Sequence, residues 1–333
     1  MFIIQRYPLA VLFCFITMLC WGSWANTQKL AAKSWRFELF YWDYVIGILV
    51  FSLLNGFTLG SFGQQGRSFL ADLRQVSPGN FGSAVAGGII FNAANILFSA
   101  AISVAGMAVA FPVAIGLALV LGVLVNYIGA EKGDPARLFL GVALVTLAIL
   151  LNALAYRRAS RSQARLSTKG LMLSLAAGLL MSFFYRFVAR SMDLVHLESP
   201  AAGKMTPYSA MFVFSLGILA SNVLFNTLLM RYPVQGAAVT YRDYLRGKFS
   251  THLVGMLGGV IWGLGNSLNL IAAGKAGPAI SYGLGQGATL VAACWGVFIW
   301  KEFRQAPGGT GKLLAGMFVL FVAGLGLLIY AGA

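Results

Sequence analysis

Two pairs of asparagines stand in otherwise apolar stretches of the chain, where an amide is well suited to bind a polar solute. Asn92 and Asn95 are three residues apart and share a helical face, as do Asn266 and Asn269. Amides in hydrocarbon are costly unless paired, and they serve equally well to hold helices together. The same pattern in two places favours a lined cavity, and interhelical hydrogen bonding is the alternative.

Aromatic residues accompany these amides. Trp21 and Asn26 fall near the end of one apolar run, and Tyr282 and Gln286 are one helical turn apart in a glycine-rich stretch. Ring faces cover apolar or π surface while amides replace lost water, so the set suits a neutral hydrogen-bonding solute such as a sugar or ureide. Membrane-interface tryptophans and simple packing are the alternatives. We expect these residues to line the site: Trp21, Asn26, Asn92, Asn95, Trp262, Asn266, Asn269, Tyr282 and Gln286.

Asp43 follows Phe40-Tyr41-Trp42 near the start of an apolar run, and it is the acid that we expect within the hydrocarbon. Charges at membrane depth are expensive and are functional by default, so Asp43 is the candidate proton-coupling site. The alternative is an interfacial carboxylate paired with Lys29, Lys33 or Arg36.

Three cationic residues are secondary candidates for the site: Lys29, Arg186 and Lys275. Arg186 could bind an anion, but we favour a side chain that extends outward to the membrane surface. Lys275 stands in a Gly/Pro break, from which it could reach a cavity or face water.

The elements that carry these residues are membrane helices. Of the 333 residues 59% are hydrophobic and 10% are charged, and the mean hydropathy is +0.80. Apolar runs of about 20 residues predict helices rather than shorter, alternating barrel strands. We predict an all-α integral membrane protein with spans at residues 8–28, 39–59, 81–104, 107–128, 137–156, 170–190, 207–229, 250–272, 276–299 and 313–331. The first run could be a cleavable signal peptide, but the repeat described next favours its retention as a helix.

An offset of 171 residues superimposes two stretches of the chain. It aligns Asn95 with Asn266, Gly106 with Gly277, and Glu131 with Glu302. Five spans per half is an odd number, so the two halves would face opposite ways as inverted five-helix repeats, with a substrate site between them. We predict a first repeat at 1–156, a basic linker at 157–169 and a second repeat at 170–333.

The net charge of +15 is explained better by the orientation of the chain in the membrane than by binding to nucleic acid, because the basic residues lie mostly between apolar runs. Of the 24 lysines and arginines, 15 fall in the loops that follow the odd-numbered spans. These loops are therefore predicted to be cytoplasmic and both termini to be outside. The basic linker is interpreted as a solvated connector, with lipid binding or regulation as the alternative.

Enzymatic chemistry is not indicated. The three cysteines lie in apolar runs without ligand spacing, and the two histidines, His196 and His252, have no Glu or Cys at ligand spacing. HExxH and GxSxG motifs are absent from the sequence, and no cofactor or metal is predicted.

The repeated helices resemble those of the drug/metabolite transporter superfamily. The residues that carry the resemblance are Ala100, Ala105-Gly106, Ala108, Pro112, Gly116, Glu131 and Gly141 in the first half, and Ala272, Ala276-Gly277-Pro278, Gly287, Glu302 and Gly316 in the second. Trp21-Gly22-Ser23 with Asn26 and Lys29, and Trp42-Asp43-Tyr44, are most similar to the glucose/rhamnose uptake and ureide permease branches. The second half has Phe183-Phe184-Tyr185-Arg186 in place of Trp-Gly-Ser, so we expect an asymmetric pocket.

The resemblance implies alternating access, ion-coupled movement of a small polar solute, and gating contacts at Glu131 and Glu302. We therefore predict a proton-coupled uptake permease for a neutral sugar or ureide in a bacterial inner membrane. Its partners would be the small-molecule substrate, membrane lipid and a coupling proton or cation, but no nucleic acid; a homodimer is left open. An exporter of hydrophobic compounds and a non-transporting scaffold or receptor are the alternatives.

Overall fold

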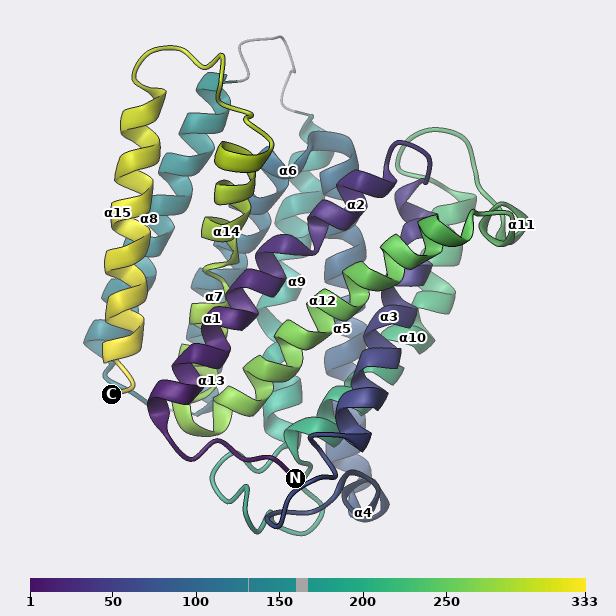
Figure 1. Cartoon of the computed structure of the whole chain (residues 1–333), viewed down its shortest axis with the longest axis vertical. Coiled ribbons are helices and arrows are strands. Elements are labelled where there is room, and N and C mark those ends of the chain that lie inside the picture. The colour runs from purple at the N-terminus through teal and green to yellow at the C-terminus, as the bar shows by residue number, and fades with distance from the viewer. Residues whose placement is uncertain (131, 160–166) are drawn as a thin grey trace.

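The computed structural model describes residues 1–130, 132–159 and 167–333, and it is helical through most of these ranges (Figure 1). Within them, ten helical segments are long and apolar enough to cross a membrane. Each of the ten predicted spans is confirmed, with ends that differ by at most four residues. The protein is thus a multi-pass membrane protein of the all-α class. Glu131 and residues 160–166 of the predicted linker lie outside the described residues.

Three spans are built from more than one helical piece. The spans are α1 with α2 (Tyr7–Ser23, Ala25–Ala31), α3 (Phe37–Phe57), α5 (Pro78–Ala105), η1 with α7 (Phe111–Ile115, Gly116–Gly129), α8 (Pro135–Ala159), α9 (Thr168–Ser191), α10 (Pro207–Arg231), α12 (Phe249–Ala276), α13 with α14 and η2 (Pro278–Gly285, Ala288–Cys294, Trp295–Ile299), and α15 (Thr310–Tyr330). Short helices α4 (Phe69–Gln75) and α11 (Tyr241–Leu245) lie in the connections, and α6 (Met107–Ala110) leads directly into η1.

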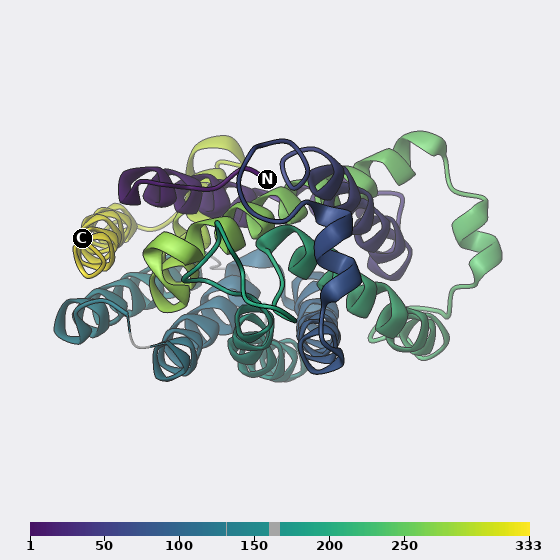
Figure 2. The ribbon, with the colours of Figure 1, turned by 90° about the horizontal axis from the view of Figure 1, so that it is seen from below.

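The helices form a closed ring. In order around it, α15, α8, α7, α9, α5, α10, α3, α12 and α1 each contact the next, and α13 closes the ring between α1 and α15, while α14 packs on α1. Figure 2 shows the ring flattened into two layers, with α1, α12 and α3 in one and α9, α5 and α10 in the other. Both layers mix helices from the two halves of the chain, so side chains from both halves meet between them.

Two matching glycine contacts hold this arrangement together. A Cβ on Gly259 of α12 would lie 1.9 Å from the Tyr44 carbonyl oxygen of α3. A Cβ on Gly88, which is 171 residues earlier on α5, would lie 2.2 Å from the Phe214 carbonyl oxygen of α10. Small residues allow such close backbone approach between membrane helices. The second helix of each half therefore packs on the third helix of the other.

Helices α5 and α12 share more than this contact. Each has 28 residues, and their bounds differ by 171. Each ends at a glycine with positive φ, 77° at Gly106 and 84° at Gly277. Backbone in this region is accessible almost only to glycine, which explains why both helices stop at these positions.

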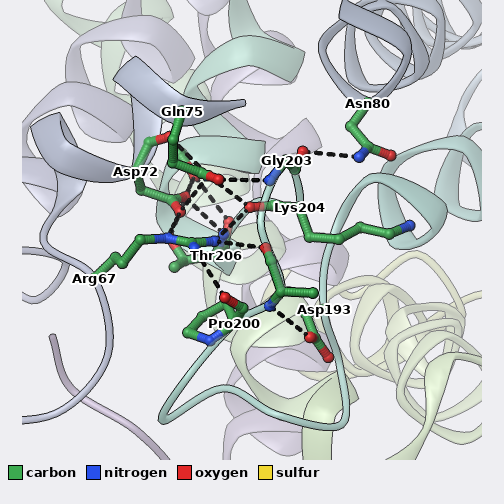
Figure 3. A network of polar contacts seen from close by, with 11 residues as sticks. Arg67, Asp72, Gln75, Asn80, Asp193, Pro200, Gly203, Lys204 and Thr206 are labelled. Atoms are coloured by element: carbon green, nitrogen blue, oxygen red, sulfur yellow. Dashed lines mark hydrogen bonds and ion pairs between the residues drawn. The ribbon is translucent and has the colours of Figure 1, made fainter. Parts of the chain in front are cut away.

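A buried polar network lies at the end of the bundle that carries both termini (Figures 1 and 3). Asp72 is fully buried, accepts from Arg67 Nε at 2.8 Å and from the Thr206 backbone N–H at 2.7 Å, and binds the Ser209 hydroxyl. Arg67 also donates to the carbonyls of Pro200, at 2.8 Å, and Lys204, at 2.7 Å. The network ties the connection between α3 and α5 to the connection between α9 and α10.

Asp72→Asn should destabilise the protein. The amide nitrogen cannot accept from the donors that surround the carboxylate, and Arg67 loses its counter-ion. Buried donors left without acceptors cost about 1–3 kcal/mol. We expect a lower melting temperature in detergent, with Asp134→Asn as the control because the Asp134 side chain is 41% exposed. Equal melting temperatures for the two variants would contradict this account of the network.

Candidate substrate site

The centre of the bundle holds a small aromatic cavity between the two layers. Its volume is about 30 Å³, close to the space of one water molecule. The lining residues are Trp21, Trp24, Phe91, Asn95, Phe98, Phe111, Ile115, Met181, Phe184, Trp262, Gln286 and Ala288. None of them is charged, so the cavity is suited to an uncharged solute.

Aromatic rings from both halves meet at this cavity. The ring of Trp262 lies 4.2 Å from that of Phe91 and is stacked on Trp21, with centroids 6.1 Å apart and planes within 7°. Tyr282 meets the edge of Trp21 at 6.5 Å. Stacked and edge-to-face rings of this kind offer a flat π surface to a planar group.

The backbone is irregular where two spans pass the cavity. Phe111–Ile115 form a π-helical turn, and the ninth span is interrupted at Gln286 and Gly287 between α13 and α14. The two irregular segments are again about 171 residues apart. Irregular helix at membrane depth is tolerated where it lines a cavity, and π-helical turns occur frequently at functional sites. Both features therefore support a binding site here.

The predicted asparagines are not all brought to this cavity. Asn95 lines it and donates to the Tyr41 hydroxyl at 3.3 Å. Asn92 donates to Ser221 of α10 at 3.0 Å, and Asn266 to the Met211 sulfur of α10 at 3.1 Å. Asn269 donates to the Ser281 carbonyl at 2.8 Å. All four asparagines thus make interhelical contacts in this conformation, and of the four only Asn95 also lines the cavity.

Of the other predicted lining residues, some line the cavity and others lie outside it. Trp21 and Gln286 line the cavity, while Tyr282 borders it through Trp21 and donates to the Met181 carbonyl at 3.0 Å. Asn26 lies farther toward the end opposite the termini, where its Oδ1 accepts from Trp300 Nε1 at 2.7 Å. Among the described residues, the buried Trp21 Nε1 has no hydrogen-bond partner.

A larger opening, here called the vestibule, lies at the end opposite the termini and has a volume of about 830 Å³. It is lined by residues of α2, α5 and α6 and of the loops near them, including Gln28, Lys29, Trp35, Arg36 and Ser103. Gln28 donates to the Ser99 carbonyl at 3.1 Å. Beyond it, Trp24 and Phe98 have ring centroids 6.4 Å apart and line the aromatic cavity. One layer of side chains therefore separates the vestibule from the cavity.

Asp43 lies near this end of the bundle but not in the cavity. It is 2% exposed, and it contacts His252 of α12 and Tyr244 of α11 rather than Lys29, Lys33 or Arg36. Lys29 instead bonds Glu302 at 2.7 Å and lies over the Trp300 ring.

Comparison with known proteins identifies the family. A family model described as ureide permease matches residues 40–169 and 153–331, which is most of the chain. The chain belongs to the ureide permease family. It is 24% identical to ureide permease 5 of Arabidopsis thaliana over 398 residues, covering 98% of this chain and 95% of that protein.

Other relatives of this permease show the same extent of match. Ureide permease 1 of Arabidopsis thaliana is 22% identical over 385 residues, covering 99% of this chain and 98% of the relative. Probable ureide permease A3 of Vigna unguiculata is 22% identical over 370 residues, covering 90% and 97%. A solved structure described as "Crystal structure of protein" matches 97% of this chain and 96% of its own, with a TM-score of 0.61 at 18% identity, and so shows the fold alone. The family is one of permeases rather than enzymes.

Two of the secondary cations of the permease do not line the cavity. Arg186 donates to the Val125 carbonyl at 3.0 Å beside a cleft at the end that carries the termini. Lys275 is exposed at the C-terminal end of α12.

Sequence reasoning did not place several cavity residues of the permease: Trp24, Phe98, Phe111, Met181 and Phe184. Aromatic residues are common in membrane spans, so their types alone do not separate the cavity from lipid-facing or packing positions. His252 was also missed as the partner of Asp43, because the two are 209 residues apart. The useful signal would have been that spans two and eight both begin on the same side of the membrane.

Proposed function

We propose that this permease carries a ureide, a small uncharged solute with a planar amide framework, into the cell by alternating access. The observation that carries the proposal is the uncharged aromatic cavity where Trp21, Trp262 and Phe91 meet. The names of the relatives support the choice of a ureide over a sugar.

The chemistry of a ureide fits the groups at this cavity. Its planar N–C=O units offer π faces to the rings, and its carbonyls accept hydrogen bonds while its N–H groups donate them. Trp21 Nε1 provides an unpaired donor, and Asn95 and Gln286 provide amides that can both donate and accept. A hydrogen-bonding site of this kind discriminates strongly against solutes that leave its polar groups unpaired.

The cavity must widen for binding, because small-molecule sites usually enclose about 300–1,000 Å³. We infer that the layer of Gln28, Trp24 and Phe98 moves so that cavity and vestibule join. The Asp72 network and the contact of Tyr282 with Met181 lie on the other side of the cavity, toward the termini. The conformation described here is therefore closed toward the termini and nearly open toward the vestibule.

The wider architecture supports the same mechanism. We infer two inverted five-helix units and membership of the drug/metabolite transporter superfamily, supported by the matching ends of α5 and α12 and the paired contacts of Gly88 and Gly259. The excess of basic residues in the loops at the vestibule end supports a cytoplasmic vestibule, with both termini outside. For location we propose a bacterial inner membrane, and for the driving force a proton gradient.

Exchange in proteoliposomes tests the substrate class. Vesicles loaded with unlabelled allantoin, a ureide, should take up labelled allantoin rapidly at equal pH on both sides. Unlabelled hydantoin should compete, because it keeps the cyclic planar N–C=O framework, whereas glucose and rhamnose should not. Exchange of a sugar but not of allantoin would contradict the ureide proposal and identify a sugar as the substrate. Exchange of neither, with folded protein in the vesicles, would favour an exporter of hydrophobic compounds.

A further inference from the structure

Asp43, His252 and Tyr244 form a compact buried cluster outside the aromatic cavity. The Nδ1 atom of His252 lies 2.9 Å and 3.0 Å from the two carboxylate oxygens of Asp43. The Tyr244 hydroxyl donates to Oδ1 of the same carboxylate at 2.6 Å. The carboxylate comes from α3, the imidazole from α12 and the phenol from α11, so the cluster joins three elements.

The packing around the cluster holds its members in contact. Trp35 meets the edge of the His252 ring at 5.2 Å, and the Tyr244 ring meets it at 4.8 Å and 84°. A Cβ on Gly255 would lie 2.5 Å from the Cβ of Asp43, so only glycine at this position lets α12 come so close. Trp35 also lines the vestibule, which places the cluster one side chain away from that opening.

Asp43 has no other charged partner in the described part of the chain. The remaining ionisable groups on the elements packed against α3 and α12 are held by other partners or are exposed, except Tyr44, whose buried hydroxyl has no hydrogen-bond partner among the described residues and whose ring packs on Trp24, Phe40 and Tyr41. Lys29 pairs with Glu302, Arg36 with Glu38, Asp243 with Thr240, and Tyr41 with Asn95; Arg231 lies beside the Tyr232 ring; and Arg242, Arg246, Lys248 and Lys275 are exposed. His252 and Tyr244 are therefore the titratable groups that face Asp43.

Tyr244 serves as a fixed donor in this cluster. Burial, and then the hydrogen bond and negative charge of Asp43, raise the pKa of Tyr244 above its ordinary value. The phenol consequently keeps its proton at physiological pH and donates a hydrogen bond to Asp43. The protons that can be exchanged are those of the carboxylate and the imidazole.

We propose that Asp43 and His252 together bind the coupling proton of this permease. The proposal rests on the proposed function and adds His252 to the single carboxylate that the sequence indicated. With neutral His252 and ionised Asp43 the pair carries one negative charge. Uptake of one proton from water gives either the ion pair or two neutral groups, and in both forms the pair has no net charge.

Burial links this proton to the conformation. An uncompensated charge is expensive away from water, and the proton-bound pair has no net charge. A movement that exposes the pair to water favours release. Helix α12 carries His252 and, ten residues later and about 15 Å along its axis, Trp262 of the cavity. A shift of α12 would therefore act on the proton site and the solute site together.

The test compares His252→Asn with His196→Asn in proteoliposomes with the membrane potential clamped. Asparagine keeps a donor near the Nδ1 position but does not titrate, and the His196 side chain is 72% exposed at the other end of the protein. One proton per solute predicts accumulation of allantoin by about tenfold for a pH difference of one unit. The wild type and His196→Asn should reach this ratio, and His252→Asn and Asp43→Asn should fall to a ratio of one while still exchanging allantoin at equal pH.

The outcomes separate the two proposals. Failure of the wild type to exchange allantoin would overturn the proposed function, whatever the variants do. Normal exchange together with tenfold accumulation by His252→Asn would overturn the role of His252.

A second measurement covers the case in which His252→Asn does not fold. Because the chain has two histidines, ¹⁵N-histidine NMR of the intact protein, assigned with His196→Asn, can follow His252 directly. The His252 signals should shift when allantoin is added at constant pH, while those of His196 should not. Signals of His252 that respond neither to pH nor to allantoin would overturn the proposal.

Discussion

Trp262→Leu is expected to weaken the binding of allantoin by about 10- to 100-fold. Stacking of a planar base on an aromatic side chain contributes about 1–3 kcal/mol, and a loss of this size corresponds to such a change in affinity. The Trp262 ring centroid lies 4.2 Å from that of Phe91 and its plane is parallel to that of Trp21, so it supplies an indole face where rings from both halves meet. Leucine retains apolar bulk but offers no π face. The dissociation constant can be measured by isothermal titration calorimetry of the purified permease.

Trp42→Leu is the matched control for this substitution. Trp42 is also on a membrane helix, but its indole donates to the Met230 sulfur at 3.2 Å and packs on Tyr241, away from the cavity. It should lose some thermal stability and bind allantoin with unchanged affinity. Equal losses of affinity in the two variants would argue against Trp262 as a substrate contact.

The second large effect is expected at the glycine contacts between halves. Gly259→Ala places a methyl group 1.9 Å from the Tyr44 carbonyl oxygen, where neither backbone can yield without moving a whole helix. Overpacking usually costs about 1–3 kcal/mol and occasionally more, and we expect the upper end here because the contacting atom belongs to the backbone. Gly88→Ala should behave alike, since its methyl would lie 2.2 Å from the Phe214 carbonyl oxygen.

The control for these glycines is Gly326→Ala in α15, where nothing lies within 4 Å of the added methyl. Alanine favours helix over glycine, so this variant should melt at the same or a higher temperature. Thermal unfolding in detergent, followed by size-exclusion chromatography, distinguishes the variants. A Gly259→Ala protein as stable as Gly326→Ala would show that α3 and α12 are not held at this distance.

The membrane helices were predictable from sequence because span length is set by the thickness of the hydrocarbon. The interruption of the ninth span was less accessible: residues 276–299 were predicted as one continuous span, whereas α13 ends at Gly285 and the chain resumes as α14 at Ala288. The run Gly285-Gln286-Gly287 contained the signal, since two glycines flank a polar residue.

The candidate site was predictable in part. The 171-residue offset placed Asn95 and Trp262 near the centre, but it could not say which way the other amides turn. Asn92 and Asn266 both turn toward α10, because the helices that flank them provide Ser221 and Met211 there. Contacts between distant segments, such as Asp43 with His252 or Arg67 with the carbonyl of Lys204, depend on how the helices close into a ring, and composition and periodicity do not encode this directly.

The most direct test of the aromatic cavity as the ureide site is substrate protection of a cysteine placed in its wall. Ala288→Cys puts a thiol at the cavity, and Ser103→Cys puts one in the vestibule, both in a background in which Cys14, Cys20 and Cys294 are replaced by serine. We expect saturating allantoin to slow alkylation at position 288 at least tenfold, with a much smaller change at position 103 and no protection by glucose. Unchanged alkylation at position 288 in a protein that still exchanges allantoin would place the ureide elsewhere and contradict the account.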